Sequence, residues 1–353
     1  MTEVCSLAII RANFVLTRGA IVRNKVWYIL SVALSIIMVT TGALSCSGNS
    51  GGKSIVKLAM ADYFNTWLST YAIRENIITS DKVDVRMDLI ADFDLQMRVG
   101  NYPMGAMSTS MFAISCEQSG LKFKGLSTMV VHQGAVTQSG VNILYTKADS
   151  AINSPADLIG KKVGVPDLTS SATSVFLGML KQEYGINEDQ LVLEPRANPL
   201  LLELLRRGEL DAAMLGGNIS PRAYVDPSLK IVWNLDEVFY NKYGGVFFPS
   251  MLVVEEKYYN SNQDLAREVY ELLVRSNAYG EQHFAELAAK YIAEYDQNQS
   301  LEFYQMIFDN HSRNQLLPIE GRTRDTLMTT FEMVQTRGII TTLPDPSVVF
   351  VTW

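Results

Sequence analysis

The sequence predicts an α/β protein made of two lobes with a cleft between them. Short apolar runs that are typical of buried strands alternate with stretches in which apolar residues recur at helical spacing, as in βαβ units. The chain has 353 residues, which exceeds the usual size of one hydrophobic core. Four predicted strands are followed by turns rich in short polar side chains. Because ligands bind beyond the carboxyl ends of strands in open α/β sheets, we expect these turns to meet at one cleft.

The first lobe is predicted to start with a βαβ unit. Strands are expected at residues 54–60, 83–90 and 104–107, and helices at 67–75 and 95–99, because apolar residues recur there with the matching period. The turns after the first and third strands carry short polar and aromatic side chains. They supply six candidate ligand-binding residues: Asp62, Tyr63, Thr66, Ser108, Thr109 and Ser110.

Residues 154–186 form the segment around which the second lobe is organised. The apolar run 161–166 predicts a strand, and helical spacing predicts a helix over 172–184 that ends at Gly185. Four hydroxyl side chains near the start of this helix are candidate ligand contacts: Thr169, Ser170, Ser171 and Thr173. A helix N-terminus carries unpaired N–H groups and a partial positive charge, which suits an anionic ligand group. Helix capping alone explains the same residues, so both interpretations stand.

The other strands of the central region are expected at 122–131, 141–146, 191–194 and 210–215, with an amphipathic helix over 199–207. We expect the chain to cross from the first lobe to the second in the strand 141–146.

Arg222 follows the strand 210–215 and is the strongest single candidate for a charged ligand contact. A guanidinium in this place is suited to bidentate pairing with a carboxylate or sulfonate. An ordinary surface arginine is the alternative, because most arginines are exposed. Asn218 is a polar candidate in the same turn, and Phe247 is a candidate for an apolar wall of the cleft.

The chain is expected to return to the first lobe near residue 250. A strand is predicted at 251–254, followed by helices over 263–295, 301–308 and 321–336, where apolar residues recur every three or four positions. The predicted first lobe consists of residues 54–140 and 250–353, and the second lobe of residues 141–249.

The first 53 residues have the order of an export signal. Basic residues precede an apolar run over 26–44, which leads to Cys46 and a stretch rich in Gly and Ser. This resembles a bacterial lipoprotein signal, with a signal peptide at 1–45, Cys46 as the lipid-bearing residue and a flexible tether at 46–53. That pattern has Leu three places before the Cys, whereas Ala43 stands there in this chain. An uncleaved membrane-spanning helix is the alternative, since the run approaches the ~20 residues needed to cross a bilayer. Both interpretations place the body of the chain outside the cytoplasm.

The charge of the chain argues against a nucleic-acid partner. The net charge is −7. Residues 1–45 hold four basic residues and one acidic residue, so the remainder has 26 basic and 36 acidic residues, a net charge of −10. An acidic body without a basic stripe is a poor match for a phosphate backbone.

The sequence contains no recognisable catalytic or metal-binding motif. The three histidines, His132, His283 and His311, are scattered and lack metal-ligand spacing. No Ser-His-Asp order or motif with paired carboxylates is present. We therefore predict no catalytic residue, no metal and no cofactor.

Several motifs resemble a known family. The segment 157–166, the hydroxyls at the following helix start and the segment 208–213 are similar to extracytoplasmic solute-binding proteins of ABC importers. Within these, the nitrate, sulfonate and taurine group with its thiamine-precursor relatives is the most similar. Residues 61–63 and 248–249 resemble a sister branch, the 4,5-dihydroxyphthalate decarboxylases. The resemblance covers about residues 54–345 and implies the periplasmic binding protein type 2 fold, with a mixed sheet flanked by helices in each lobe.

The resemblance implies a lipid-anchored binding protein that captures a small anionic organic solute by lobe closure. Such a protein delivers its solute to an ABC permease in the membrane, and we expect it to be a monomer. A decarboxylase-like enzyme acting on an aromatic acid is one alternative. That branch carries a histidine in the strand after Phe-Pro, whereas this strand has Leu252, so a binding role is favoured. A sensory or adhesin lipoprotein is the other alternative.

Overall fold

The structure is a computed structural model, and it describes residues 52–118, 120, 122–132 and 141–352. The predicted signal peptide, Cys46 and nearly all of the predicted tether lie outside the described residues. The residues from Lys53 onward form one compact unit, which is the unit described below. Within the described part of the chain, no helix combines the length and apolar character that crossing a membrane requires.

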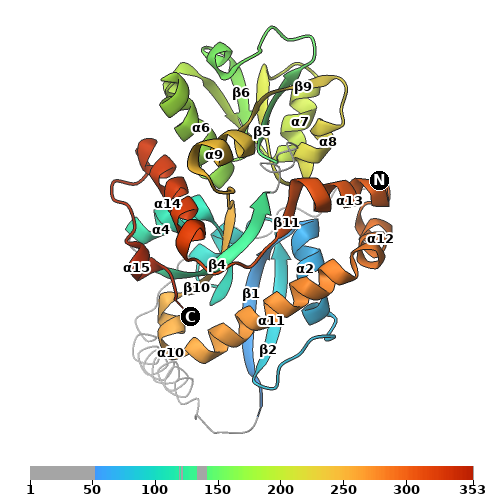
Figure 1. The fold of residues 1–353 in the computed structure, drawn as a ribbon, viewed down its shortest axis with the longest axis vertical. Helices are drawn as coiled ribbons and strands as arrows, with labels where there is room; N and C mark the ends of the chain where they lie inside the picture. The colour runs from blue at the N-terminus through green and yellow to red at the C-terminus, as the bar shows by residue number, and fades with distance from the viewer. Residues whose placement is uncertain (1–51, 119, 121, 133–140, 353) are drawn as a thin grey trace, which may run out of the picture. The chain divides into compact units, whose positions relative to one another are not determined.

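The first of two sheets has six strands in the order β11-β4-β10-β3-β1-β2 and occupies the lower part of Figure 1. Its strands are β1 (Ser54–Ala61), β2 (Val83–Ile90), β3 (Met104–Ser108), β4 (Phe123–His132), β10 (Ser250–Glu255) and β11 (Ser312–Asn314). Strand β1 pairs in parallel with β2 and β3, whereas β10 runs antiparallel to both β3 and β4. Strand β2 has the bounds that the sequence predicts.

The second sheet has five strands in the order β7-β6-β8-β5-β9 and occupies the upper part of Figure 1. Its strands are β5 (Ile143–Lys147), β6 (Lys162–Val165), β7 (Val192–Pro195), β8 (Ala212–Leu215) and β9 (Leu229–Asn234). Strands β7, β6 and β8 are parallel, and β5 runs antiparallel to β8 and β9. Both sheets are therefore mixed, and the strands of the second come from the chain between the two parts of the first.

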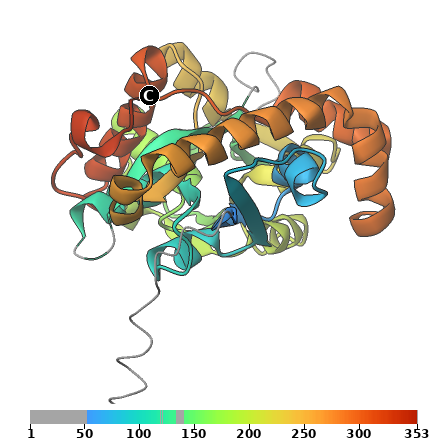
Figure 2. The ribbon, with the colours of Figure 1, turned by 90° about the horizontal axis from the view of Figure 1, so that it is seen from below.

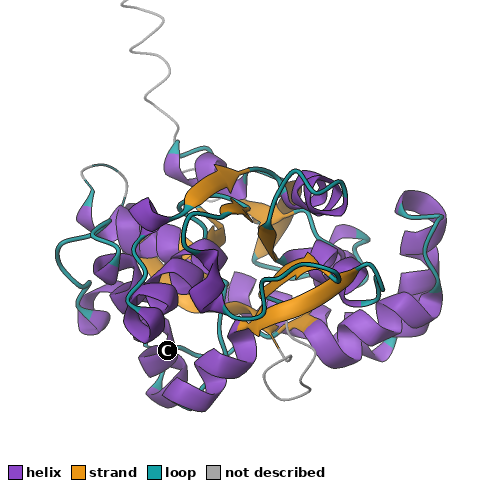
Figure 3. Cartoon of the chain, turned by 90° about the horizontal axis from the view of Figure 1, so that it is seen from above, coloured by secondary structure: helices purple, strands orange, loops and turns teal. Residues whose placement is uncertain are grey.

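Helices cover both faces of the first sheet (Figures 2 and 3). The helices from the same parts of the chain are α2 (Phe64–Arg74), α3 (Phe93–Arg98), α4 (Thr109–Glu117), α10 (Glu256–Ser261), α11 (Gln263–Gln282), α12 (Phe284–Tyr295), α13 (Leu301–Met306), the π-helical turn η4 (Ile307–His311), α14 (Gly321–Thr336) and α15 (Pro346–Val349). Along β1, Leu58 faces the core that holds Leu272 of α11, whereas Ala59 faces the core that holds Phe112 of α4. This alternation follows from the two-residue period of a strand and explains why both faces are apolar.

The second sheet is covered in the same way. Its helices are η1 (Pro155–Leu158), α6 (Ser171–Tyr184), η2 (Glu188–Gln190), α7 (Asn198–Arg206), η3 (Gly217–Ile219), α8 (Ser220–Tyr224) and α9 (Leu235–Tyr243). Val163 and Val165 of β6 lie in one core with Phe176 of α6. Gly164 between them faces α7, where an added Cβ would lie 2.6 Å from Leu201 Cδ2. The absence of a side chain at Gly164 therefore lets α7 approach the sheet closely.

Helix α14 packs against helices of both sheets. Phe331 lies in the core of the first sheet with Phe112 of α4. Met333, two residues later, lies in the core of the second sheet and contacts α6 at Gly178, where an added Cβ would be 2.8 Å from Met333 Sδ. Helix α14 therefore contributes side chains to the cores of both sheets.

The structure differs from the sequence prediction in two ways: one predicted helix is divided, and some elements were not predicted. The helix expected over 263–295 is two helices, because the chain breaks at His283, whose ring stacks on Tyr279 at a centroid distance of 3.9 Å. Helices α4 and α9 and strand β9 were not predicted. Nearly all of α4 is buried, so it lacks the polar face that reveals an amphipathic helix.

Candidate functional site

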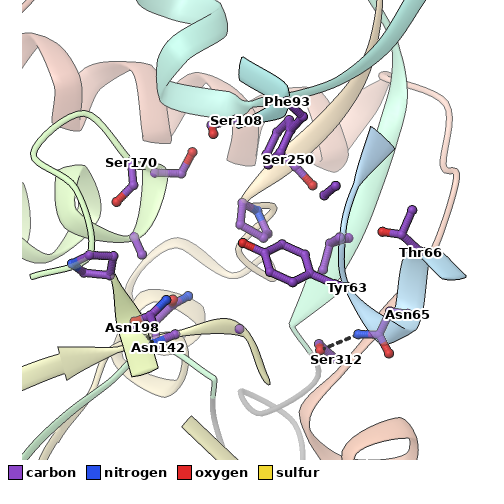
Figure 4. A pocket seen from close by; sticks show the side chains of 18 residues that line it. Tyr63, Asn65, Thr66, Phe93, Ser108, Asn142, Ser170, Asn198, Ser250 and Ser312 are labelled. Atoms are coloured by element: carbon purple, nitrogen blue, oxygen red, sulfur yellow. Dashed lines mark hydrogen bonds between the residues drawn. The ribbon is translucent and has the colours of Figure 1, made fainter. Parts of the chain in front are cut away.

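Two connected cavities lie between the sheets. The inner cavity has a volume of about 160 Å³ and the outer cavity about 790 Å³. Tyr63, Ser108 and Ser170 line both, so the two cavities adjoin. Figure 4 shows the inner cavity with Tyr63 in its middle and Ser108, Ser170, Asn198 and Asn142 around it. The walls are contributed by both sheets, as the predicted cleft requires.

The pairing of the strands explains why these side chains meet. Ser108 ends the parallel strand β3, and the antiparallel neighbour β10 begins opposite it at Ser250. In the same way, β11 begins at Ser312 opposite His132 at the end of β4. The start of an antiparallel strand lies at the same sheet edge as the end of a parallel strand. Ser250 and Ser312 therefore line the inner cavity together with Ser108.

The inner cavity is lined by uncharged residues and by the first turns of several helices. Residues from the N-termini of α2, α6 and α7 face it, and Ser108 precedes α4. Asn65 donates a hydrogen bond from Nδ2 to Ser312 Oγ at 2.8 Å, which fixes that amide (Figure 4). The hydroxyl of Thr66 is fully buried and has no hydrogen-bond partner among the described residues. Helix N-termini and a free hydroxyl together suit an acidic group.

The hydroxyls at the start of α6 cap the helix and also join the two sides of the cleft. Ser170 accepts the N–H of Thr173 at 3.2 Å, which confirms the predicted capping. Ser171 accepts the backbone N–H of Ser110, in α4, at 3.0 Å. The hydroxyl of Ser110 in turn donates to the carbonyl oxygen of Thr169 at 2.5 Å. Ser110 is therefore one of the residues through which the first sheet's side is hydrogen-bonded to α6 and the turn before it.

The outer cavity is rimmed by charged side chains. Four carboxylates line it, from Asp62, Asp92, Asp94 and Asp167, together with the guanidinium groups of Arg98 and Arg222. Among the residues that the structure describes, no group of three or more His, Cys, Asp or Glu side chains is placed to hold a metal ion. With four carboxylates and two guanidinium groups, the rim contains more negative than positive groups.

Asp94 is the rim carboxyl that Ser108 holds. It accepts the backbone N–H of Ser108 at 2.7 Å and also the hydroxyl of Ser108. Burial raises the pKa of Asp94 to about 6, because the hydrogen bonds from Ser108 and the charge of Arg98 only partly offset desolvation, and Asp167 adds to the rise. The pKa of Tyr63 is also raised, by burial and then by the charges of Asp94 and Asp62.

Arg222 forms an ion pair across the cleft. Its Nη2 lies 2.7 Å from Oδ2 of Asp296, and the side chains are 37% and 17% exposed. The same Oδ2 accepts the hydroxyl of Tyr304 at 2.7 Å, and Tyr304 packs on Phe64 of α2. Arg222 belongs to α8 beside the second sheet, so this pair joins the two sides of the cleft at the edge away from α14.

We expect Arg222→Gln and Asp296→Asn to weaken solute binding to the same extent, by ~1 kcal/mol or about fivefold. The pair joins the two sides of the cleft, and its partial exposure keeps the effect small. Isothermal titration with a solute found by the screen below provides the measurement. Arg207→Gln, which removes an exposed arginine paired with Glu209, is the control and should have no effect. A loss confined to Arg222→Gln would instead show that Arg222 contacts the solute directly.

The structure brings most of the predicted ligand-binding residues to the cavities, but not all. Eight of them line one or both cavities: Asp62, Tyr63, Thr66, Ser108, Thr169, Ser170, Ser171 and Arg222. Four others do not line them: Thr109, Ser110, Thr173 and Phe247. The hydroxyl of Thr109 donates to the carbonyl of Phe248 at 2.7 Å, and Phe247 is 1% exposed in the core beside Phe239. The side chain of Asn218 lies outside what the structure describes.

Sequence reasoning missed several lining residues. Asp94 follows the carboxyl end of β2, so the rule that selected the other turns could have found it. Asn198 follows β7 in the same way. Asn142 precedes the antiparallel strand β5 and Ser250 begins the antiparallel strand β10, and the sequence alone does not give the direction in which strands pair.

Comparison with the sequences of known proteins gives one distant relative. A 4,5-dihydroxyphthalate decarboxylase of Comamonas testosteroni is 29% identical over 111 residues. The match covers 31% of this chain and 32% of that protein, so it spans about a third of the relative's length.

Solved structures of similar fold cover much more of the chain. The alkanesulfonate-binding protein SsuA of Xanthomonas axonopodis pv. citri, bound to MOPS, matches with a TM-score of 0.66 and 11% identity, covering 84% of this chain and 96% of that one. A Candida albicans protein described as having the generic periplasmic binding protein fold matches with a TM-score of 0.60 and 12% identity, covering 83% and 92%. These likenesses confirm the two-lobe periplasmic binding protein fold.

The chain also matches a model of a protein family. Residues 101–283, more than half of the chain, match the model described as NMT1/THI5 like. The matched range runs from the strand that ends at Ser108 through the whole second sheet to the end of α11, so it includes the walls contributed by β3, α6 and β10. The chain belongs to the NMT1/THI5-like family.

Proposed function

We propose that the protein is an extracytoplasmic solute-binding protein of an ABC importer, anchored to the membrane by a lipid at Cys46. The observation that carries the proposal is the cavity between the two sheets, with polar walls from both of them. The two sides would close on a small organic solute, exclude water and present a docking surface to a membrane permease. The protein would act as a monomer. The similarity to SsuA, a binding protein, supports this function.

The solute would carry an acidic group held in the inner cavity. The supporting features are the helix N-termini around it and the hydroxyl of Thr66, which has no hydrogen-bond partner among the described residues. The uncharged, partly apolar walls around Tyr63 and Phe93 would contact the rest of the molecule. Among the predicted ligand-binding residues, those that line the cavities are the ones we propose as contacts, except Arg222, whose guanidinium pairs with Asp296.

A thermal-shift screen of the purified full-length chain tests this function. The panel contains nitrate, sulfonates, aromatic and aliphatic carboxylates, and pyrimidine precursors. A true solute at about 100 times its dissociation constant should stabilise the fold by roughly 2.7 kcal/mol. A shift with one class, with the compound recovered unchanged, supports solute binding. The absence of a shift with every class contradicts it and favours the sensory or adhesin alternative.

A decarboxylase-like enzyme is the second candidate function. The observations that favour it are the sequence relative from Comamonas testosteroni and the raised pKa of Asp94, a property common among catalytic acids. Release of carbon dioxide from an aromatic acid, abolished by Asp94→Asn, would establish this activity. Recovery of every bound acid unchanged would exclude it for the acids tested.

A further inference from the structure

The side chain of Arg337 is 4% exposed, yet it lines neither cavity. Arg337 is the residue that follows α14. Its Nε and Nη2 donate hydrogen bonds to the two carboxylate oxygens of Glu188, at 2.5 and 3.2 Å. Such a bidentate pair compensates for the cost of removing a guanidinium from water. The pair does not use the third nitrogen, Nη1.

The Nη1 group of Arg337 reaches the turn that precedes α6. It donates to the carbonyl oxygen of Leu168 at 2.7 Å and to Oγ of Ser174 at 3.1 Å. Leu168 stands between Asp167 and Thr169, which both line the outer cavity. Arg337 therefore binds the backbone of a turn whose neighbouring side chains line the cleft, although Arg337 itself lies outside the cleft.

The next carbonyl of the same turn is held by Ser110. The hydroxyl of Ser110 donates to the carbonyl oxygen of Thr169 at 2.5 Å, and its N–H donates to the hydroxyl of Ser171 at 3.0 Å. Ser110 belongs to α4 and Arg337 follows α14, and both helices pack in the core of the first sheet (Figure 1). The turn itself joins β6 of the second sheet to α6. Two successive carbonyls of this turn are thus held from the first sheet's side.

The hydrogen bonds within the turn are local. Oδ1 of Asp167 accepts the N–H and the hydroxyl of Thr169, at 2.6 and 2.7 Å. The carbonyl oxygen of Asp167 accepts the hydroxyl of Ser170 at 3.1 Å. Bonds of this kind shape a turn, but they do not connect it to another element. The connection to the first sheet's side comes through Arg337 and Ser110.

We propose that Arg337 is a positioning residue that keeps the start of α6 assembled on the first sheet's side, whether the cleft is open or closed. The guanidinium contacts no solute and acts through the Leu168 carbonyl. The first residues of α6 and its cap, Ser170, Ser171 and Ala172, line the inner cavity and have their place before a solute enters. Groups that are already in place lower the cost of binding, because the ligand need not order them. The effect on solute capture rests on the proposed function, whereas the positioning does not.

Hydrogen–deuterium exchange of the full-length chain without solute tests the positioning. Arg337→Lys keeps a positive charge opposite Glu188, but one ammonium cannot also reach the Leu168 carbonyl. Amides of residues 167–173 should exchange about fivefold faster or more, because opening the turn no longer breaks that hydrogen bond. Arg324→Lys makes the same change at an exposed arginine of α14 and is the matched control. In the control, exchange of the turn should stay within about twofold of the unaltered chain.

Two comparisons separate positioning from a general loss of stability. Amides of β1 should stay protected in Arg337→Lys at the exposure times at which the turn exchanges. Faster exchange of β1 and the turn together would assign the effect to the whole fold and overturn the proposal. Glu188→Gln removes the ion pair but leaves both hydrogen bonds of Nη1, so exchange of the turn should rise by less than about twofold. A rise as large as in Arg337→Lys would make the ion pair the cause and overturn the role of the Leu168 contact.

Isothermal titration then tests the effect on solute capture. The probes are the compounds of the panel: nitrate, sulfonates, carboxylates and pyrimidine precursors. A compound that binds the unaltered chain should bind Arg337→Lys about fivefold more weakly and Arg324→Lys with the same affinity. Unchanged affinity in Arg337→Lys, despite faster exchange of the turn, overturns the role in capture. If no compound binds the unaltered chain, the proposed function fails, and the exchange measurements still decide whether Arg337 positions the turn.

Discussion

Asp236→Ala is expected to lower the free energy of unfolding by about 3 kcal/mol. The Asp236 side chain is 1% exposed and accepts hydrogen bonds from the backbone N–H groups of Val141 and Asn142, at 2.6 and 3.1 Å. Its other oxygen accepts Nδ2 of Asn142 at 2.9 Å. Alanine would leave these donors buried without an acceptor. Because Asn142 lines the inner cavity, solute affinity should fall as well. Urea denaturation followed by circular dichroism gives the change in stability.

Asp149→Ala serves as the control for this substitution. Asp149 is an exposed carboxylate in the turn after β5, so its removal should change the stability by less than about 0.5 kcal/mol. Asp236→Asn should give an intermediate loss, since its amide keeps one acceptor oxygen. A loss for Asp236→Ala no larger than that of the control would show that these hydrogen bonds do not hold β5 in place.

Gly105→Ala is expected to destabilise the first sheet by about 3 kcal/mol. Gly105 lies in β3 between β1 and β10. A Cβ there would lie 2.3 Å from the carbonyl oxygen of Ala59 and 2.8 Å from Met97 Sδ. The methionine can move, but the carbonyl belongs to the paired strand and cannot move without breaking the sheet. The thermal midpoint and the urea midpoint should both fall.

Gly164→Ala is the matched control, because Gly164 also lies within a strand. Its Cβ would meet only the ends of flexible side chains, Leu201 Cδ2 at 2.6 Å and Leu210 Cδ1 at 2.7 Å, with the next atom at 3.5 Å. We expect a smaller loss, about 1 kcal/mol, since these leucines can rotate. Equal losses at the two glycines would mean that the backbone contact with Ala59 is not the cause.

The strands and helices with a clear hydrophobic period could be predicted from the sequence. Strand β2 and helix α14 have the predicted bounds, because each has an unambiguous apolar pattern with defined ends. Helix α4 shows the limit of this reasoning. It is buried from Thr109 to Ser115, so its apolar residues do not recur with a helical period against a polar background.

The candidate site could be predicted only where it follows parallel strands. The rule that ligands bind beyond strand carboxyl ends found Tyr63, Ser108 and Ser170, which line both cavities. It also selected Thr109, whose side chain turns into the protein, because the rule does not say which way a side chain points. Phe247, which was expected as an apolar wall of the cleft, lies in the core for the same reason. Pairings that join distant parts of the chain, such as the ion pair of Arg222, depend on the folded arrangement and leave no local pattern.

Helix α14 packs in the cores of both sheets. The two edges of the cleft therefore differ in how strongly they resist separation. On one side, Met333 packs on Gly178 with almost no space between them, and apolar contacts of this kind resist separation. On the other side, the Arg222–Asp296 pair is reachable by water, so its replacement by hydration costs little. If the cleft opens as proposed, we therefore expect a rotation about an axis near α14 rather than a uniform separation. Distances near α8 then change most, so probes placed there report opening with the greatest sensitivity.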